Sequence, residues 1–474
     1  MKNPDLVKAI LEIPVESQNL EFKRLSGNKI VAKIIETIVA MANTDGGIII
    51  LGVDDPEKTK LKDGARIFGI EEDATLYDEV MHEIKNITPS FNSLEVTKLE
   101  FSDNKTIVLL SIKKATNEFY SIKENVFVRL YKSNKKLSPQ EIVKLSYAKG
   151  FEKADRELVD IDFDLLDTSY FYEWKNNRGI RDKNIKTILY KVGLARKDNN
   201  ILKPTIAAVL LFAEYPTNLM ETKCAVRVLQ YQGKTEKFGE VPNLLQLPKT
   251  IDGPIIDIIR DTQNYVLNLL KSGIRINSGF VNQYTIPERV IKEAITNAII
   301  HRDYNLKRDV EIRLYEDRIE ILSPGLFPYN ITNSNIGRVR ADGQRNDLLV
   351  KHLREFPDPP NLDLNEGVQS MREEMQKQNL YEPIFLTYPA YQDSVNVVLF
   401  NEHQPSEWEK VKKYLETNIY ITNPIAREIT GIVQSHKMSR LFKKWVKKGL
   451  LLKINSESNN PKDTKYKLLD SNDL

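Results

Sequence analysis

Cysteine, histidine and long apolar runs are scarce in this chain of 474 residues, and each scarcity excludes a class of protein. The single cysteine, Cys224, excludes an intramolecular disulfide and suits a reducing compartment. With one cysteine and five histidines, the chain cannot form a typical structural zinc site. No run reaches the roughly 18 apolar residues of a membrane span, and the first residues lack the apolar core of a signal peptide. We therefore predict a cytoplasmic protein with no membrane partner.

Net charge is also small, at +3. The chain as a whole therefore gives no reason to expect an anionic partner, and only local clusters of basic residues can argue for nucleic acid. The hydrophobic fraction of 41% is that of ordinary globular domains. At this length a single core is not expected, so we predict three or four domains.

The spacing of apolar residues predicts an α+β multidomain protein in four parts. The first has strand alternation in LEFKRL and a helix pattern in KIVAKIIETIVAMANT, and the third has a hairpin pattern in DVEIRLYEDRIEILSPG. The last has three helix patterns followed by a hairpin, which is winged-helix order. The second part shows no recognisable chemistry, and we interpret it as scaffold. The expected parts are residues 1–145, a connector at 146–280, a third mixed helix and strand unit at 281–403 and a winged helix at 404–474.

The first group of candidate site residues lies near the N-terminus and comprises Glu16, Glu21, Lys23 and Asp55. The segments VESQNLEFKRL and AMANTDGGIIILGVDD that carry them resemble the Schlafen AlbA-type domain, over roughly the first 140 residues. The resemblance implies an AlbA-like α/β domain that binds nucleic acid, with Lys23 among the contacting residues.

Animal Schlafens use this domain to cut RNA, and the resemblance places Glu16, Glu21 and Asp55 at the acidic positions of that metal-dependent site, with Lys23 on the phosphate. Three carboxylates can hold Mg²⁺ or Mn²⁺, which activates water and neutralises a scissile phosphate. The alternative is structural: Glu21 and Lys23 form an ion pair, Asp55 caps a turn and Glu16 is solvated. The animal nucleases pair two such lobes and this chain has one, so the arrangement would require a homodimer.

A second group begins with Glu293 and Asn297, which stand four residues apart on one face of a predicted helix. At that spacing a carboxylate can act as general base for water while an amide oxygen binds Mg²⁺ beside a triphosphate. The same two residue types at this spacing also occur in many helices by chance.

The ordered segments EAITNAIIHRDY, DRIEILSPG, QRNDLL, NEGVQSM and YEPIF resemble the ATP-binding domain called the RecG-like C-terminal domain. It belongs to the superfamily of gyrase, Hsp90, histidine kinases and MutL, with a Bergerat-type α/β sandwich. The resemblance implies ATP with Mg²⁺, Glu293 as the base and Asn297 as metal ligand. Ser323 and Gln369 depart from the superfamily pattern, and the alternative is a fold that has lost its nucleotide. The other candidate nucleotide contacts are Asp303, Gly325, Arg345, Asn346 and Gly367.

Two other ATP-dependent functions are excluded. His301-Arg302-Asp303 imitates a kinase catalytic loop, but Arg308 stands where that loop needs asparagine, and no glycine-rich loop with a partner lysine is present. No G-x-x-x-x-G-K-[ST] segment occurs, so the motor of a helicase is absent. We expect neither a kinase nor a helicase, and a weak ATPase activity remains open.

The third group lies on a basic helix that precedes the predicted C-terminal hairpin. Leu441, Trp445 and Val446 are expected to form its buried side, and no acidic residue occurs between Gln434 and Lys453. Such a helix suits the major groove, with lysines on phosphates. The alternative is a solvated face on a dimerisation module. The candidate nucleic-acid contacts are His436, Lys437, Ser439, Arg440, Lys443, Lys444 and Lys447.

Together these groups predict a DNA-binding transcription regulator whose state responds to ATP. One alternative is a divalent-metal-dependent nuclease gated by the ATP domain, acting on RNA or DNA, with antiviral defence as one role open to it. The other is a scaffold whose flanking modules bind protein. We expect DNA rather than RNA as the partner, and a homodimer or a larger even-numbered assembly.

Overall fold

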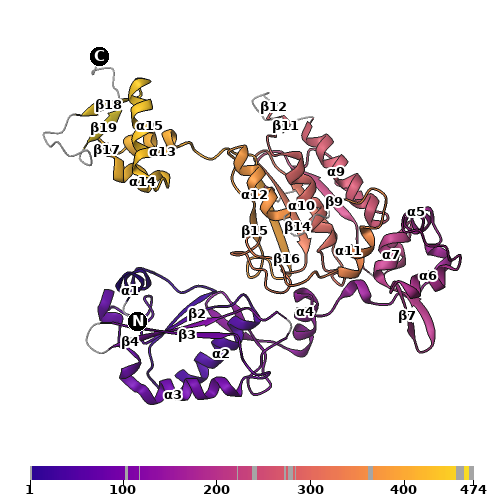
Figure 1. Cartoon of the computed structure of the whole chain (residues 1–474), viewed down its shortest axis with the longest axis horizontal. Helices are drawn as coiled ribbons and strands as arrows, with labels where there is room; N and C mark the ends of the chain where they lie inside the picture. Colours follow the sequence, from indigo (N-terminus) through magenta and orange to yellow (C-terminus); the bar gives the residue numbers. More distant parts are fainter. Residues whose placement is uncertain are drawn as a thin grey trace. The chain divides into compact units, whose positions relative to one another are not determined.

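The computed structural model divides the chain into two compact units, residues 1–378 with 382–401 and residues 379–381 with 402–474 (Figure 1). Each unit is described by itself. The structure describes residues 3–101, 105–116, 118–220, 222–237, 243–271, 274–275, 281–282, 284–360, 367–454 and 464–468.

The N-terminal domain of the first unit is built on a four-stranded sheet in the order β1-β2-β4-β3. Strands β1 and β2 are parallel, and the crossover between them is helix α2, whereas β4 runs antiparallel to both of its neighbours. Separate apolar clusters cover the two faces of the sheet, one against α2 and α3 and the other against α1. The elements are α1 (Pro4–Leu11), β1 (Leu20–Lys23), α2 (Ile30–Asn43), β2 (Gly47–Leu51), η1 (Asp63–Arg66), η2 (Ile70–Asp73), α3 (Ala74–Glu83), η3 (Ile84–Asn86), β3 (Leu94–Glu100), β4 (Thr106–Ile112), β5 (Phe127–Leu130) and β6 (Ser133–Lys136).

The turn between α2 and β2 fixes where the first site residues lie. Gly47 has φ +156°, and a Cβ there would lie 2.7 Å from the carbonyl oxygen of Asn19, so only glycine permits β2 to approach the start of β1. At the end of α2 the Asn43 amide donates to the carbonyl oxygens of Tyr120 and Phe127, at 2.7 and 2.9 Å. These contacts hold the β5–β6 hairpin against the helix.

A connector follows, from α4 to α8. Helix α4 begins after Ser138, whose hydroxyl and Glu141 form a capping box, and ends at Gly150 in the left-handed conformation. The segment DKNIKTILYKVGL, in which the sequence predicts a helical hairpin, contains the single helix α6. The elements are α4 (Pro139–Lys149), η4 (Ala154–Arg156), η5 (Phe163–Leu166), α5 (Ser169–Asn177), α6 (Ile185–Lys191), β7 (Ala195–Asp198), β8 (Ile201–Pro204), α7 (Ile206–Phe212) and α8 (Pro216–Leu219).

The third domain is a six-stranded sheet in the order β10-β9-β13-β14-β16-β15, with α9, α10 and α12 side by side on it (Figure 1). Strands β9 and β10 fall within the predicted connector, so the structure moves the start of this domain upstream of residue 281. The reason is β9, which pairs in parallel with β13 and therefore cannot belong to a separate scaffold. The elements are β9 (Val226–Gln230), β10 (Lys249–Ile251), α9 (Ile255–Lys271), β11 (Ile274–Arg275), β12 (Val281–Asn282), α10 (Glu288–Ile300), β13 (Val310–Leu314), β14 (Arg318–Pro324), α11 (Asp347–Leu353), α12 (Gly367–Lys377), β15 (Ile384–Leu386) and β16 (Ser394–Phe400).

The second unit has winged-helix order, with its sheet arranged β17-β19-β18. Apolar side chains from all three helices and from the hairpin meet in one core. Most of the polar hairpin tip that the sequence predicts, at 455–463, lies outside the described residues. The elements are α13 (Glu407–Leu415), β17 (Ile421–Thr422), α14 (Asn423–Thr430), α15 (Ser435–Lys447), β18 (Leu451–Ile454) and β19 (Lys465–Leu468).

Across both units, no helix in the described part of the chain has the length and apolarity needed to cross a membrane.

Candidate nucleotide and nucleic-acid sites

A cavity of about 220 Å³ lies between α10, α12 and the segment from Gly325 to Arg345. Five of the seven residues predicted to contact nucleotide line it: Glu293, Asn297, Gly325, Arg345 and Gly367. They come from four separate stretches of sequence, and the fold brings them to one place.

Glu293 and Asn297 form the polar end of this cavity. The Asn297 amide nitrogen donates to a Glu293 carboxylate oxygen at 2.8 Å. The amide oxygen, which can only accept hydrogen bonds, therefore points away from this carboxylate oxygen. Gly367 is the first residue of α12, and a Cβ there would lie 1.9 Å from Glu293 Oε1. A larger residue at the start of α12 would therefore displace the Glu293 carboxylate. An acceptor oxygen beside a carboxylate fits a divalent cation such as Mg²⁺.

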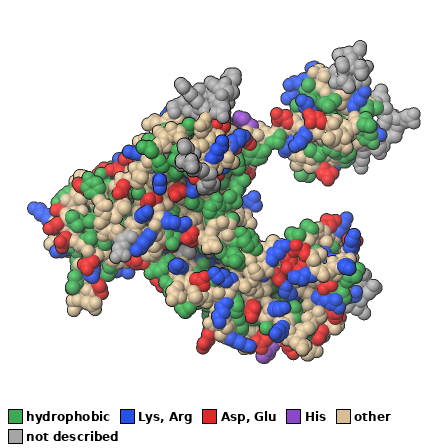
Figure 2. All heavy atoms as spheres, turned by 180° about the vertical axis from the view of Figure 1, so that it is seen from behind, with side chains coloured by type: hydrophobic (Ala, Val, Ile, Leu, Met, Phe, Trp, Pro, Cys, Tyr) green, Lys and Arg blue, Asp and Glu red, His purple; other side chains and the backbone are tan. Residues whose placement is uncertain are grey.

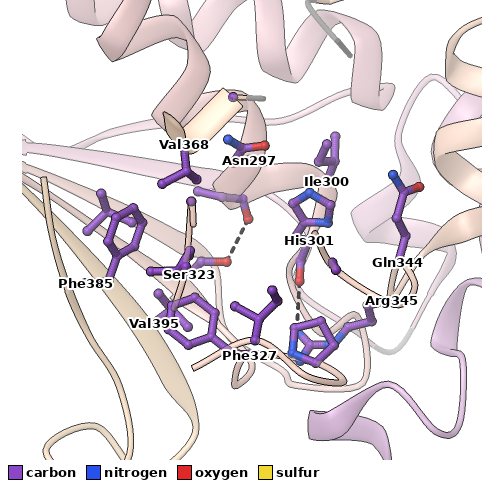
Figure 3. A pocket seen from close by; sticks show the side chains of 18 of the residues that line it. Asn297, Ile300, His301, Ser323, Phe327, Gln344, Arg345, Val368, Phe385 and Val395 are labelled. Carbon is purple, nitrogen blue, oxygen red and sulfur yellow. Dashed lines mark hydrogen bonds between the residues drawn. The ribbon is translucent and has the colours of Figure 1, made fainter. Parts of the chain in front are cut away.

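Arg345 lines the side of the cavity opposite Asn297, as Figure 3 shows. Its guanidinium donates to the His301 carbonyl oxygen at 2.8 Å and to the Leu326 carbonyl oxygen. Gly325 has φ +111°, and a Cβ there would lie 2.2 Å from Arg345 Nη1, so the glycine makes room for the arginine. Burial, and secondarily the charge of Arg345, lowers the pKa of His301 to about 4. The imidazole is therefore neutral at physiological pH.

Ser323 also lines the cavity. It is one of the residues that depart from the pattern of the superfamily, whose motif at this point of the sequence supplies an aspartate. Its hydroxyl donates to the Ala298 carbonyl oxygen at 2.7 Å, as the dashed line in Figure 3 marks. With its proton used in this way, the serine oxygen can only accept hydrogen bonds from a ligand, which is the role of that aspartate toward an amino group. Phe385 and Val395 lie beside it and form an apolar wall. No sequence motif indicates this wall, although the strand pattern VNVVLF places Val395 and Val397 on one face.

Asp303 and Asn346, the other two expected nucleotide contacts, do not line this cavity. Asp303 accepts from the backbone N–H of Asn305 at 3.0 Å. The Asn346 amide donates to the carbonyl oxygens of Ile300 and Arg302, both at 2.8 Å, at the end of α10. Helix ends leave carbonyl groups unpaired, and a neighbouring asparagine satisfies them. Both residues are buried and act on the backbone that presents the site.

The cavity-lining segment near Phe327 is also attached to the N-terminal domain. Lys114, which follows β4, donates to the carbonyl oxygens of Phe327 and Ile331, at 3.2 and 2.6 Å. Burial lowers the pKa of Lys114, and the neighbouring carboxylate of Asp45 partly offsets this. The Tyr329 hydroxyl donates to the Gly150 carbonyl oxygen at the end of α4, at 3.1 Å. A change at the cavity can therefore reach the N-terminal domain through direct hydrogen bonds.

The N-terminal carboxylates are buried and already paired with cations. Glu21 accepts from Lys23 and from Arg129 of β5. The Glu21–Lys23 ion pair, which the sequence offered as the structural alternative to a metal site, is therefore present, and Arg129 is a second partner. Asp55 lies 2.6 Å from Lys58 Nζ and accepts from the Glu57 backbone N–H, which makes it a turn cap. Although burial by itself raises the pKa of Asp55, these two hydrogen bonds outweigh it and lower the pKa.

Glu16 departs from the structural alternative, because it is buried and not solvated. One carboxylate oxygen accepts from the Phe22 backbone N–H at 2.9 Å. Burial raises its pKa, and the charges of Glu21 and Asp55 add to that effect, so the three carboxylates act on one another electrostatically. Within the described residues, however, no three acidic, histidine or cysteine side chains are arranged to hold a metal ion.

Helix α15 presents the predicted basic surface. Six of the candidate residues are exposed, namely His436, Lys437, Arg440, Lys443, Lys444 and Lys447. Ser439 is half-buried and accepts from the Asn423 side chain at 2.9 Å, so it joins α15 to α14. The buried stripe is Met438, Phe442 and Trp445, whereas the predicted Leu441 and Val446 are only partly buried. On the face of the molecule that Figure 2 shows, basic and acidic side chains are interspersed.

Comparisons with known proteins agree with this geometry in two regions. Residues 16–138 match the family model described as "Schlafen, AlbA_2", and residues 307–399 match the one described as "Putative ATP-dependent DNA helicase recG C-terminal". No curated protein matches the chain. A crystal structure of the DIP2311 protein from Corynebacterium diphtheriae is 14% identical, covers 95% of each chain and has a TM-score of 0.39, a likeness too low to support any conclusion. The two family matches support a nucleic-acid-related, ATP-binding protein of α+β multidomain architecture.

Proposed function

We propose that this protein is a DNA-binding transcription regulator whose affinity for DNA responds to ATP. The observation that carries the proposal is the Glu293–Asn297 pair packed against Gly367, in the same chain as the exposed basic helix α15. A nucleotide site and a DNA-binding helix together are what ligand-controlled DNA binding requires.

In this proposal each part of the cavity has one role toward the nucleotide. The Asn297 amide oxygen would hold Mg²⁺, which supplies charge neutralisation for the phosphates, and Glu293 would orient a water molecule. The N–H groups at the start of α12 suit an anion. Ser323 would accept from the adenine amino group, and the apolar wall at Phe385 would cover the ring.

Lys114 and Tyr329 support a route for the response. They fasten the cavity-lining segment to the N-terminal domain and to α4. A nucleotide that moves this segment must strain or break those hydrogen bonds. By thermodynamic linkage, DNA would then change the affinity for ATP by the same factor as ATP changes the affinity for DNA.

The test is a DNA-binding titration of the full chain with and without ATP and Mg²⁺. We expect ATP to change the dissociation constant at least about fivefold, the lower end of ordinary allosteric coupling. Asn297→Ala should abolish the change and keep the affinity without ATP. Lys114→Met should keep ATP binding and reduce the change. Equal DNA affinity and equal oligomeric state with and without ATP would contradict the proposal.

A metal-dependent nuclease is the second candidate. The observation in its favour is the cluster of three buried, mutually interacting carboxylates with Lys23 beside them. Against it, Glu21 and Asp55 are each satisfied by cations of the protein. The name of the second family match mentions a helicase, but the chain lacks the phosphate-binding motif of a helicase motor, so we propose no unwinding.

A further inference from the structure

The connector has the same order and pairing of elements as the winged helix of the second unit. Before its helices, Leu158 forms an antiparallel bridge with Thr205, and the Val159 N–H donates to the Pro204 carbonyl oxygen at 2.9 Å. Then come α5, α6 and the antiparallel hairpin β7–β8. In the second unit, β17 precedes α14 and α15, and it pairs with β19, the last strand of the hairpin. In both places the segment before the two helices pairs with the end of the hairpin, through strand β17 in the second unit and through an isolated bridge at Leu158 in the connector.

The packing of α6 determines which side chains face outward. Ile188 and Leu189 are buried, as are Leu194 and Ala195 where the hairpin begins. Lys186 and Tyr190, four residues apart, therefore share the outer face of α6, and Tyr190 is 51% exposed. Lys197 of the hairpin places its Nζ 5.9 Å from the centre of the Tyr190 ring, so helix and hairpin form one surface.

This surface is locally basic. Residues 181–197 contain six lysines and arginines and one acidic residue, whereas the whole segment 158–204 contains nine basic and seven acidic residues, a net charge of +2. Two of the acidic groups are taken by neighbours: Asp182 by Lys191 at 3.1 Å, and Asp198 by Lys203 at 3.4 Å. Five exposed cations have no ion-pair partner among the described residues: Arg181, Lys183, Lys186, Arg196 and Lys197.

We propose that the outer face of α6 and the hairpin β7–β8 form a second contact surface for duplex DNA, through its phosphates. This connector surface consists of the five unpaired cations and Tyr190. A concentration of like charge is unfavourable by itself, and the phosphates of a duplex, one per about 3.4 Å of helix axis on each strand, would neutralise it. The proposal rests on the proposed function in taking DNA as the partner. It replaces the scaffold role that the sequence indicated for this region.

The test compares two triple variants of the full chain. Lys183→Glu, Lys186→Glu and Lys197→Glu reverse charge on the connector surface. Lys223→Glu, Lys292→Glu and Lys351→Glu make the same change at exposed positions of the third domain. Affinity for a 30-base-pair duplex is measured between 50 and 300 mM salt. Since each phosphate contact contributes about 0.9 to the slope of log K against log salt, the connector variant should lower the slope by about 3 and the affinity at least about tenfold.

A connector variant that binds with the affinity and slope of its matched control would overturn the proposal. Should the glutamate variant fail to fold, the corresponding glutamine variant decides by the same criterion. A third variant, Lys443→Glu, Lys444→Glu and Lys447→Glu, separates this proposal from the proposed function. Loss of slope in the connector variant with unchanged binding in the α15 variant would support the connector surface and contradict the role of α15. The reverse result would contradict the connector surface alone.

Discussion

Replacing Glu21 by alanine should destabilise the N-terminal domain, whatever else it does. The Glu21 and Arg129 side chains are 6% and 1% exposed, and they join β1 to β5. Without the carboxylate, the Arg129 guanidinium keeps, among the described residues, the hydrogen bond to the Asn134 side chain at 3.0 Å. An arginine left buried without its counter-ion costs about 3–5 kcal/mol, a large share of the 5–15 kcal/mol that stabilises an ordinary domain.

Calorimetry of the full chain provides the measurement. A loss of 3–5 kcal/mol lowers the melting temperature of a domain of this size by about 10 °C. Glu57→Ala is the matched control, because the Glu57–Lys132 pair is also an ion pair of the N-terminal domain but is 41% and 46% exposed. An exposed pair contributes at most about 1 kcal/mol. The double variant Glu21→Leu with Arg129→Met should recover the part of the loss that comes from the unpaired Arg129, whereas Lys23, 15% exposed, still lacks its partner Glu21.

This prediction also determines how a nuclease assay must be interpreted. Cleavage of RNA or DNA with Mg²⁺ or Mn²⁺ has to be compared at a temperature at which the Glu21→Ala variant is folded. Cleavage by the wild type that disappears in the folded variant would make the carboxylates catalytic. An unchanged melting temperature in Glu21→Ala would refute the argument from the buried pair.

The other predictions concern the cavity and a buried histidine. Gly367→Ala should weaken ATP binding at least about tenfold by displacing Glu293, measured by calorimetric titration, and unchanged affinity would refute the steric argument. Ser323→Ala should reduce the preference for ATP over GTP, and an equal preference in wild type and variant would exclude the role of the serine oxygen. Burial, and secondarily Arg178, lowers the pKa of His352 to about 4, so this group stabilises the fold above pH 6.5 and loses that contribution as pH falls toward 4. Between pH 6.5 and 5 the loss in the free energy of unfolding is about 2 kcal/mol. The melting temperature should therefore fall less over this range in His352→Gln than in the wild type. Parallel curves of melting temperature against pH would contradict this.

Much of the secondary structure and two of the three site groups follow from local sequence. The helix at α2, the strand at β4, the capping box of α4 and the hairpin β13–β14 are set by apolar spacing, caps and turn residues, which act over a few positions. The spacing of Glu293 and Asn297 likewise fixes them on one helix face, and the basic residues of α15 follow from its buried stripe. These properties depend on neighbours along the chain, so the sequence by itself determines them.

The tertiary structure decided which charges are free and which are already neutralised. No local pattern shows that Arg129, 108 residues away, pairs with Glu21, or that Asn346 completes α10 and does not contact the cavity. Nor does the sequence near residue 226 show that β9 lies beside β13. The sequence also does not show that the basic residues of α6 and of the hairpin β7–β8 lie on one surface. That follows from the tertiary arrangement of the connector, which includes the bridge at Leu158. Burial and long-range pairing depend on segments that are distant in sequence, and the free energy of a charge depends on them most of all.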